Sequence, residues 1–207
     1  MAEMEKEAKL TIRPEDYLRL RQAFPVQECR EQLNVYLHDP ARLHEGLGYL
    51  RVRFESRREP VVTLKVPRGW EGEVREMWEV EEPLHRCGPG LFPRPRRRIE
   101  VATDLPEEIS EHFSSMGITH LRRLGWMRNR RCLLEVGDEG LVELDRTELP
   151  GGGVHFEVEV ETADQNRMGT LLDRIRELAP SASASRIGKF SRFLEAIPGV
   201  SLPSTGR

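Results

Sequence analysis

The sequence predicts an α+β fold in which an antiparallel sheet dominates and helices flank it. Short segments with alternating apolar and polar residues recur between turn signals, a pattern typical of antiparallel strands. Three or four amphipathic segments with helix-start signals lie among these strands. A chain of 207 residues fits a single domain, and no repeat of fixed period divides it.

Five strands and one helix are expected in the first half of the chain. The helix starts at Arg13-Pro14, because proline suits the first helical turn, and it ends before Pro25. A polar turn at 56–60 predicts that the strands on either side of it form a hairpin. The expected strands cover residues 4–12, 29–37, 49–54, 61–66 and 74–81.

The second half begins with a proline-rich and arginine-rich stretch at 85–98 that predicts a loop. Asp104 and Pro106 mark the start of a helix at 105–116. Later helices are expected at 163–178 and 189–197, with a linker of small residues at 180–185. The expected strands cover residues 121–127, 130–136, 141–144 and 154–160. We expect residues 1–197 to form the domain and 198–207 a flexible C-terminal tail.

Composition narrows the classes of partner. No apolar run approaches the roughly 20 residues that span a bilayer, and the N-terminus lacks the features of a signal peptide. The net charge of −3 provides no overall attraction to nucleic acid or to an anionic membrane. Cys29, Cys87 and Cys132 lie far apart without CxxC spacing. We therefore expect a cytoplasmic protein with three free thiols and no membrane partner.

The arginine-rich segment 94–98 raises the alternative of an RNA-binding loop. Prolines interrupt this segment, and no aromatic residues are interleaved with its arginines. These two features favour a solvated loop, so no nucleic-acid partner is expected.

Three of the expected strands place ordered charges on one face. Side chains at i and i+2 share a face of a strand, so Glu5, Glu7 and Lys9 point the same way. The same holds for Arg51 with Arg53, and for the glutamates of 157–161. A solvated sheet face would explain any one of these strands.

The three strands together indicate a different explanation. Neighbouring carboxylates repel one another unless a cation lies between them, and paired guanidiniums need an anion. Carboxylates opposite arginines therefore suit a metal-chelated polyphosphate, with Mg²⁺ or Mn²⁺ on the carboxylate oxygens and the phosphates on the arginines. The chain contains no GxxxxGK[ST] motif, which excludes a P-loop.

The segment Glu5-Lys6-Glu7-Ala8-Lys9 is similar to the ExExK motif of the CYTH domain proteins, also called triphosphate tunnel metalloenzymes. Only four of the 32 basic residues are lysines, and Lys9, Lys65 and Lys189 fall on lysine positions of that family. The resemblance extends from about residue 4 to 195. Further segments match in the expected order at 32–39, 50–53, 63–65, 124–131, 144–145, 156–159 and 188–191.

This resemblance implies an eight-stranded antiparallel β-barrel, with a charged triphosphate tunnel inside and helices around it. The implied metal ligands are Glu5, Glu7, Asp145, Glu157 and Glu159. The implied phosphate binders are Lys9, Arg51, Arg53, Lys65, Lys189 and Arg131, with Arg130 as the rival to Arg131. Glu79 or Glu81 is expected to line the tunnel. We expect catalysis to depend most on Glu5, Glu7, Lys9, Arg53 and Lys65.

The implied activity is hydrolysis of inorganic tripolyphosphate or a related triphosphate to release phosphate, with Mg²⁺ or Mn²⁺ as cofactor. A thiamine triphosphatase is an alternative, since Trp70, Trp78 or Trp126 could contact the organic group. A class IV adenylyl cyclase typically carries His-Phe shortly before ExExK, and the four residues before Glu5 hold no such pair. A non-catalytic polyphosphate or nucleotide sensor is a further alternative. The sequence leaves the substrate, the metal and the choice between monomer and homodimer open.

Overall fold

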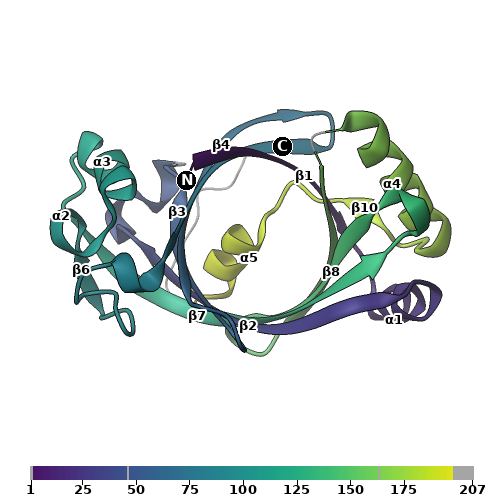
Figure 1. The fold of residues 1–207 in the computed structure, drawn as a ribbon, viewed down its shortest axis with the longest axis horizontal. Helices are drawn as coiled ribbons and strands as arrows, with labels where there is room; N and C mark the ends of the chain where they lie inside the picture. The colour runs from purple at the N-terminus through teal and green to yellow at the C-terminus, as the bar shows by residue number, and fades with distance from the viewer. Residues whose placement is uncertain (1, 46, 163, 198–207) are drawn as a thin grey trace.

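The computed structural model of the protein describes residues 2–45, 47–162 and 164–197. Within these ranges the chain forms ten strands and five α-helices. Eight of the strands close into an antiparallel ring, shown end-on in Figure 1. None of the described helices is long and apolar enough to cross a membrane. The expected tail at 198–207 lies outside the described residues.

Each strand of the ring is hydrogen-bonded to the next, and the pairing of β9 with β1 closes the circle. The predicted eight-stranded antiparallel barrel is therefore confirmed. It is an irregular one, because its strands range from seven residues in β3 to 16 in β7. In order around the ring the strands are β1 (Ala2–Thr11), β5 (Val74–Pro83), β4 (Val61–Glu71), β3 (Tyr49–Glu55), β2 (Val26–His38), β7 (His120–Glu135), β8 (Leu141–Glu148) and β9 (Val154–Glu161).

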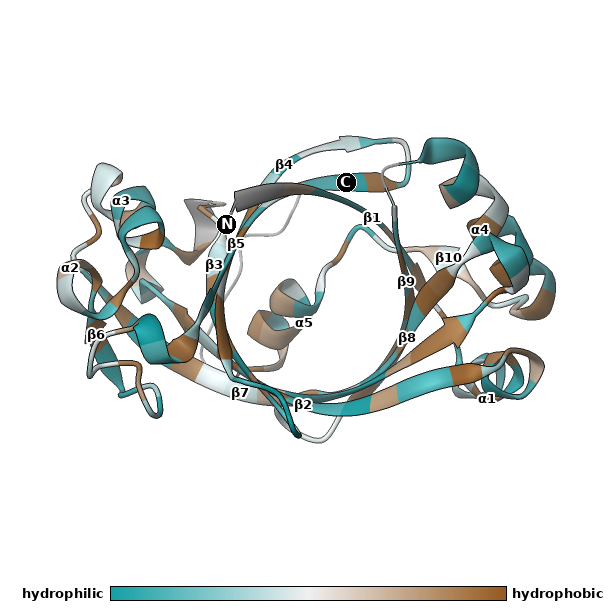
Figure 2. Ribbon diagram, in the orientation of Figure 1, coloured by the Kyte–Doolittle hydropathy of each residue, from teal (hydrophilic) through white to brown (hydrophobic). Residues whose placement is uncertain are grey.

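The inner and outer faces of the ring strands differ in polarity. Along β9, Val158 and Val160 belong to an apolar cluster outside the ring, while Glu157 and Glu159 are buried on the inside. Figure 2 shows hydrophobic and hydrophilic residues alternating along the strands. Small barrels usually fill their interior with side chains or hold one small ligand. This ring instead keeps its apolar core between the outer face and the helices.

Two groups of helices cover that outer apolar face. The helices α1 (Pro14–Ala23) and α4 (Gln165–Leu178) pack on β7, β8 and β9 through Tyr17, Leu20 and Ile175. On another side of the ring, α2 (Val101–Asp104), α3 (Glu107–Ser115) and β6 (Arg98–Glu100) pack on β2 to β5. Both groups remove apolar strand residues from water, which is the main stabilising term in folding.

The last helix, α5 (Lys189–Ala196), lies across the opening of the ring in Figure 1. Its Phe193 and Leu194 pack on Tyr36 and Met127, which project inward from β2 and β7. The rings of Tyr36 and Phe193 are 4.7 Å apart. Before it, the short strand β10 (Ser183–Ala184) pairs with β1, within the segment that the sequence predicts to be a linker. These contacts fix the start of α5 beside the inner surface of the ring.

The strand boundaries differ from the prediction mainly in β7. The sequence predicts two strands at 121–127 and 130–136, but β7 is one continuous strand. Its register against β2 shifts between Tyr36 and Leu37, next to Gly125. A glycine suits this position because an added Cβ would lie 3.1 Å from Phe193. Regular structure also occupies segments that were expected to be turns or loops. These are β6 and the 3₁₀ helices η1 (Pro40–Glu45), η2 (Leu84–Arg86) and η3 (Gly137–Glu139).

The expectation of three free thiols is wrong. Cys29 and Cys132 are register partners on β2 and β7, and they form a disulfide. Cys87 is free. A separation of 103 residues hides this pair in the sequence, because only the register of the two strands brings the sulfur atoms together.

Asp104 marks the end of α2, where the sequence predicts the start of the next helix. Its carboxylate accepts hydrogen bonds from the backbone N–H of Gly90 and of Glu100, both at 2.7 Å. The backbone approaches so closely that a Cβ on Gly90 would lie 2.0 Å from the Asp104 carboxylate. Asp104 therefore holds the 88–100 segment against α2.

We predict that Asp104→Ala destabilises the protein by about 2 kcal/mol or more, because two backbone donors lose their charged acceptor. Urea denaturation measures this change directly. Asp138→Ala, at an exposed aspartate in η3, is the control and should alter stability by less than about 0.5 kcal/mol. Equal unfolding midpoints for the two variants would contradict the assigned role of Asp104.

Candidate functional site

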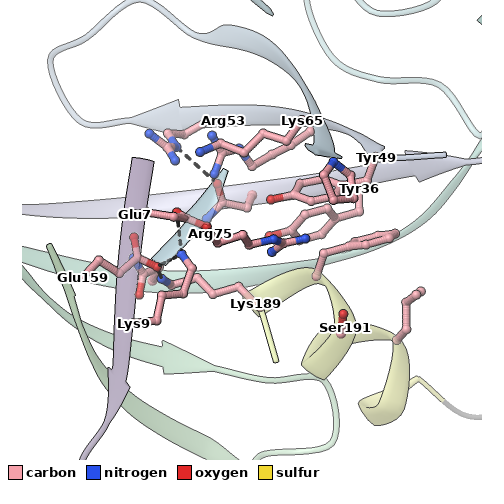
Figure 3. A pocket seen from close by; sticks show the side chains of 18 of the residues that line it. Glu7, Lys9, Tyr36, Tyr49, Arg53, Lys65, Arg75, Glu159, Lys189 and Ser191 are labelled. Atoms are coloured by element: carbon pink, nitrogen blue, oxygen red, sulfur yellow. Dashed lines mark hydrogen bonds and ion pairs between the residues drawn. The ribbon is translucent and has the colours of Figure 1, made fainter. Parts of the chain in front are cut away.

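A cavity of about 310 Å³ lies inside the ring, and we call it the tunnel cavity. One part of its lining is charged and another is aromatic and aliphatic (Figure 3). The charged residues that line it are Glu7, Lys9, Arg51, Arg53, Lys65, Arg75, Arg131, Glu159, Glu161 and Lys189. The aromatic and aliphatic residues are Tyr36, Leu43, Leu47, Tyr49, Phe190 and Leu194.

The first carboxylate group of the site combines two strands. Glu5 and Glu7 share the inner face of β1, and Glu161 is the register partner of Glu7 on β9. One oxygen atom from each of the three side chains lies within 4.8 Å of the others. Three carboxylates at such distances repel one another unless protons or cations intervene.

The second carboxylate group lies on the next pair of strands. Glu143 and Asp145 are two residues apart on β8, and Glu159 of β9 is the register partner of Glu143. Their oxygen atoms again lie within 4.8 Å of one another. Asn129 donates a hydrogen bond of 2.9 Å to Asp145, which fixes the orientation of that fully buried carboxylate.

Three lysines connect these groups to the rest of the tunnel cavity. Lys9 lies 2.8 Å from Glu7 and 2.5 Å from Glu159. Lys189, the first residue of α5, lies 2.7 Å from Asp145 and also contacts Glu157 and Glu159.

The third lysine, Lys65, lies 2.6 Å from Glu5 and 2.7 Å from Glu79. Burial alone would lower the pKa of each of the three ammonium groups. The adjacent carboxylates outweigh burial and raise the pKa of all three above the ordinary value. All three lysines therefore carry a positive charge at neutral pH.

The structure separates the two neighbouring arginine candidates on β7. Arg131 points inward and donates to both oxygens of Asp145 at 3.0 and 2.7 Å, and to Glu159 at 2.7 Å. Arg130 points outward, where its exposed side chain lies 3.5 Å from Glu31. Only Arg131 can contact a ligand in the tunnel cavity.

Three further arginines of the tunnel cavity have weak or no carboxylate contacts. Arg51 lies 4.0 Å from Glu79, and Arg53 lies 3.8 Å from Glu55. Arg75 has no carboxylate within 4.0 Å among the residues that the structure describes. Burial and the positive charges of Arg51 and Arg131 lower the pKa of Arg53 to about 10. Burial is the largest cause of this shift, and a bound anion would offset the contribution of the two neighbouring guanidiniums.

The carboxylates of the site fall into two classes by pKa. Burial opposes ionisation everywhere, but nearby lysines and Arg131 hold the pKa of Glu5, Asp145 and Glu159 below the ordinary value. Burial and neighbouring carboxylates instead raise the pKa of Glu79 and Glu143 to about 7.

The pKa of Glu161 is raised further than those of Glu79 and Glu143. Loss of water around the carboxylate, together with the charges of Glu143 and Glu5, raises its pKa to about 9, although part of the side chain is exposed. Glu161 therefore holds a proton at neutral pH in the metal-free protein, whereas Glu79 and Glu143 are only partly protonated there.

These residues fit a hard divalent cation. Both carboxylate groups offer oxygen ligands only, as Mg²⁺ and Mn²⁺ prefer, and they leave room for oxygens of a substrate. The pKa values of Glu143 and Glu161 are raised in part by repulsion from neighbouring carboxylates, and a bound cation would relieve this repulsion. Glu5, Glu7 and Glu161 would hold one ion, and Glu143, Asp145 and Glu159 could hold another.

The structure brings most of the predicted site residues to the inner surface of the ring. Glu157 belongs to neither carboxylate group and instead lies 3.1 Å from His155 and beside Lys189. Glu79 and Glu81 both lie on the inner face of β5, where Glu79 contacts Lys65 and Glu81 accepts a hydrogen bond of 3.2 Å from Thr63. None of the three tryptophans lines the tunnel cavity.

Sequence reasoning gave no role to Glu143, Glu161 or Arg75. Glu143 has the same two-residue spacing to Asp145 that Glu5 has to Glu7, so this signal was present in the sequence. Glu161 shares a face with Glu159, but its proximity to Glu5 depends on the closure of the ring. Arg75 acquires its position from the register of β5 against β1, which places it opposite Glu7.

Comparison with known proteins agrees with this architecture. The CYTH domain family profile matches residues 3–194 of the chain. No match is found among proteins with curated descriptions.

Two solved structures resemble the chain over most of its length. A Hippeastrum protein, described as a putative adenylyl cyclase with a dominant triphosphatase activity, is 24% identical, with a TM-score of 0.74 over 94% of this chain and 98% of that one. The PH1819 protein of Pyrococcus horikoshii is 19% identical, with a TM-score of 0.59 over 92% of this chain and 98% of that one. At these identities the two structures support the fold alone.

The raised carboxylate pKa values predict how stability depends on pH. Between about pH 5 and the raised values, Glu79, Glu143 and Glu161 bind more protons in the folded state than in the unfolded state. The stability of the metal-free protein therefore falls as pH rises through this window. Because a divalent cation binds the deprotonated acids, we predict that Mn²⁺ raises the Tm more at about pH 8.5 than at about pH 6.

Thermal melts with and without Mn²⁺ at the two pH values measure this effect. Glu161→Gln should reduce the stabilisation by Mn²⁺, whereas Glu107→Gln, on the exposed side of α3, should leave it unchanged. A Tm increase that is the same at both pH values would contradict the assignment of these acids to the metal.

Proposed function

The chain belongs to the CYTH domain family, and we propose that it is a metal-dependent triphosphatase that releases phosphate from a small triphosphate. One observation carries this proposal. Arg51, Arg53 and Arg75 line the same tunnel cavity as two carboxylate groups, yet among the described residues none of the three has a carboxylate closer than 3.8 Å. The cavity therefore offers unneutralised guanidiniums to an anion and oxygen ligands to a cation.

A triphosphate chelated to a divalent cation has both kinds of charge. Planar guanidiniums form paired hydrogen bonds with phosphate oxygens, so Arg51 and Arg53 suit neighbouring phosphates. Lys65 and Lys189 are point charges that can exchange a carboxylate contact for a phosphate oxygen. A single phosphate would engage only part of this set, so the substrate is a polyphosphate rather than a monoester.

In the reaction, a water oxygen bonds to the terminal phosphorus, the bridging P–O bond breaks, and the products are diphosphate, phosphate and a released proton. The phosphate oxygens gain charge in the transition state, and Arg53, Arg131 and Lys9 are placed to stabilise that charge. A bound Mg²⁺ or Mn²⁺ would neutralise the substrate and acidify a water molecule. Since phosphoryl transfer needs little covalent chemistry from the protein, positioning and charge are sufficient.

A second candidate function is hydrolysis of an organic triphosphate, such as a nucleoside or thiamine triphosphate. The tunnel cavity has an aromatic and aliphatic part where Tyr49 and Phe190 stack at 4.5 Å, with Leu43 and Leu47 nearby. Inorganic tripolyphosphate makes no use of such a surface. The dominant triphosphatase activity described for the Hippeastrum protein agrees with either substrate class.

A phosphate-release panel tests the proposal and ranks the substrates. Tripolyphosphate, ATP, thiamine triphosphate and pyrophosphate are each assayed with Mg²⁺ or Mn²⁺. We predict metal-dependent release from at least one triphosphate, and loss of about 10²-fold or more in kcat/KM for Glu7→Gln and Arg53→Ala. Metal-independent release, or release that both variants retain, would refute the tunnel mechanism. Tight binding without turnover would instead indicate a sensor.

Two adjacent arginines provide a matched test of which face of β7 acts. We predict that Arg131→Ala lowers kcat/KM by about 10²-fold or more, because it removes charge from the tunnel cavity and leaves Asp145 without its paired donor. Arg130→Ala removes the same charge from the outer face and should change kcat/KM less than about twofold. Equal losses in the two variants would show that overall charge, and not the tunnel cavity, determines the rate.

A further inference from the structure

The arginines of this chain are concentrated in a second place, outside the ring. Residues 92–98 and 120–130 contain no aspartate or glutamate, although the chain as a whole has a net charge of −3. All of their arginines are exposed: Arg94, Arg96, Arg97, Arg98, Arg122, Arg123, Arg128 and Arg130. Such asymmetry indicates an anionic partner for this part of the surface.

The fold brings the two segments side by side. β6 pairs with the first residues of β7, so that Arg98 lies opposite Arg122. Beyond that ladder the N–H of Arg123 donates to the carbonyl of Arg97 at 2.9 Å. The side chain of Arg123 also reaches the carbonyl of Pro95. Figure 1 shows β6 at the side of the ring, next to the end of β7.

A register shift in β7 aligns several of these residues on one outer face. The outer face of β2 carries every second residue of the strand, because the residues between them point inward. These outward residues are Glu31, Leu33, Val35 and Leu37. The β7 residues that pair with these four residues point outward as well. After Tyr36 the register of the two strands shifts, so that Leu37 pairs with Arg123 and Arg123 also lies on the outer face. We call the outward set, together with the adjacent segment 94–97, the arginine face. The β7 members of this face are Arg123, Trp126, Arg128 and Arg130.

Trp126 gives the arginine face an aromatic surface. Its side chain is 55% exposed, which is unusual for a tryptophan. The guanidinium of Arg128 lies 5.6 Å from the centre of its ring. Successive strand residues on one face are about 6.6 Å apart, so Trp126, Arg128 and Arg130 follow one another along β7 at about the spacing of one nucleotide.

Few carboxylates compensate these charges. Arg130 pairs with Glu31 and Arg98 with Glu100, both on the surface, where such pairs contribute little. The other six arginines have no carboxylate within 4.0 Å among residues 2–45, 47–162 and 164–197. The positive charge of the arginine face is therefore available to a ligand.

We propose that the arginine face binds single-stranded nucleic acid. Guanidiniums that lack carboxylates would pair with backbone phosphates, and an unpaired base would stack on Trp126. The prediction of no nucleic-acid partner rested on the net charge of −3, on the prolines within 94–98 and on the absence of aromatic residues between the arginines of that segment. The structure supplies that aromatic residue from a distant segment. This surface lies on the opposite face of β7 from Arg131, so the inference stands apart from the proposed triphosphatase.

Fluorescence anisotropy with a fluorescein-labelled 12-nucleotide oligo(U) or oligo(dT) tests the proposal. In low salt we expect the wild-type protein to bind the oligonucleotide. The triple variant Arg94→Ser/Arg97→Ser/Arg128→Ser should bind about tenfold or more weakly, and the slope of its log affinity against log salt concentration should be smaller by about 2. Trp126→Ala should weaken binding by about fivefold or more through lost stacking. Arg13→Ser/Arg174→Ser/Arg176→Ser removes equal charge from the α1 and α4 side and should have little effect.

Further controls separate this surface from the tunnel cavity and from misfolding. The variants should keep the wild-type urea midpoint and the wild-type phosphate release, while Arg131→Ala should keep oligonucleotide binding. No binding in low salt would overturn the proposal, as would an equal loss in the control triple variant. If a duplex of the same length bound as tightly as the single strand, and Trp126→Ala did not weaken binding, the arginine face would be an unspecific positive patch. That result would also overturn the proposal.

Discussion

Ionised side chains inside a closed ring must find their counter-charges within that ring, and this constraint governs the rest of the structure. An isolated buried charge is far too costly to persist, so each one needs a partner, a proton or a ligand. The lysines and Arg131 satisfy the constraint through short contacts with carboxylates. Glu161 satisfies it by keeping a proton, and Glu143 by partial protonation and an ion pair with Arg131. Among the described residues Arg51, Arg53 and Arg75 have no carboxylate closer than 3.8 Å, so they are left for an anion.

The same constraint explains the unusual distribution of apolar residues. Because the interior of the ring is charged, the apolar core lies between the outer face of the strands and the helices that cover it. The helix α5 then serves both environments. It packs Phe193 against Tyr36 and Met127, and its first residue, Lys189, contacts the carboxylates of β8 and β9. The arginines on the outer face of β7 are exposed to water, so they need no counter-charge from the protein.

Much of this arrangement could be predicted from the sequence because strand alternation is local. The spacing of Glu5, Glu7 and Lys9 showed which side chains share a face. The ring itself was implied by the resemblance to the CYTH domain proteins. Non-local register could not be predicted in the same way. It determines that Glu161 meets Glu5, that Cys29 meets Cys132, and that Arg131 rather than Arg130 points inward.

The central claim is that a metal-chelated polyphosphate completes the charge balance of the tunnel cavity. Crystals grown with Mn²⁺ and tripolyphosphate, and measured at the manganese absorption edge, test it most directly. The account predicts an anomalous peak between the carboxylates of Glu5, Glu7 and Glu161 or between those of Glu143, Asp145 and Glu159. It also predicts phosphate density within hydrogen-bond distance of Arg51, Arg53 or Arg75. Manganese and phosphate bound only outside the ring would contradict the account.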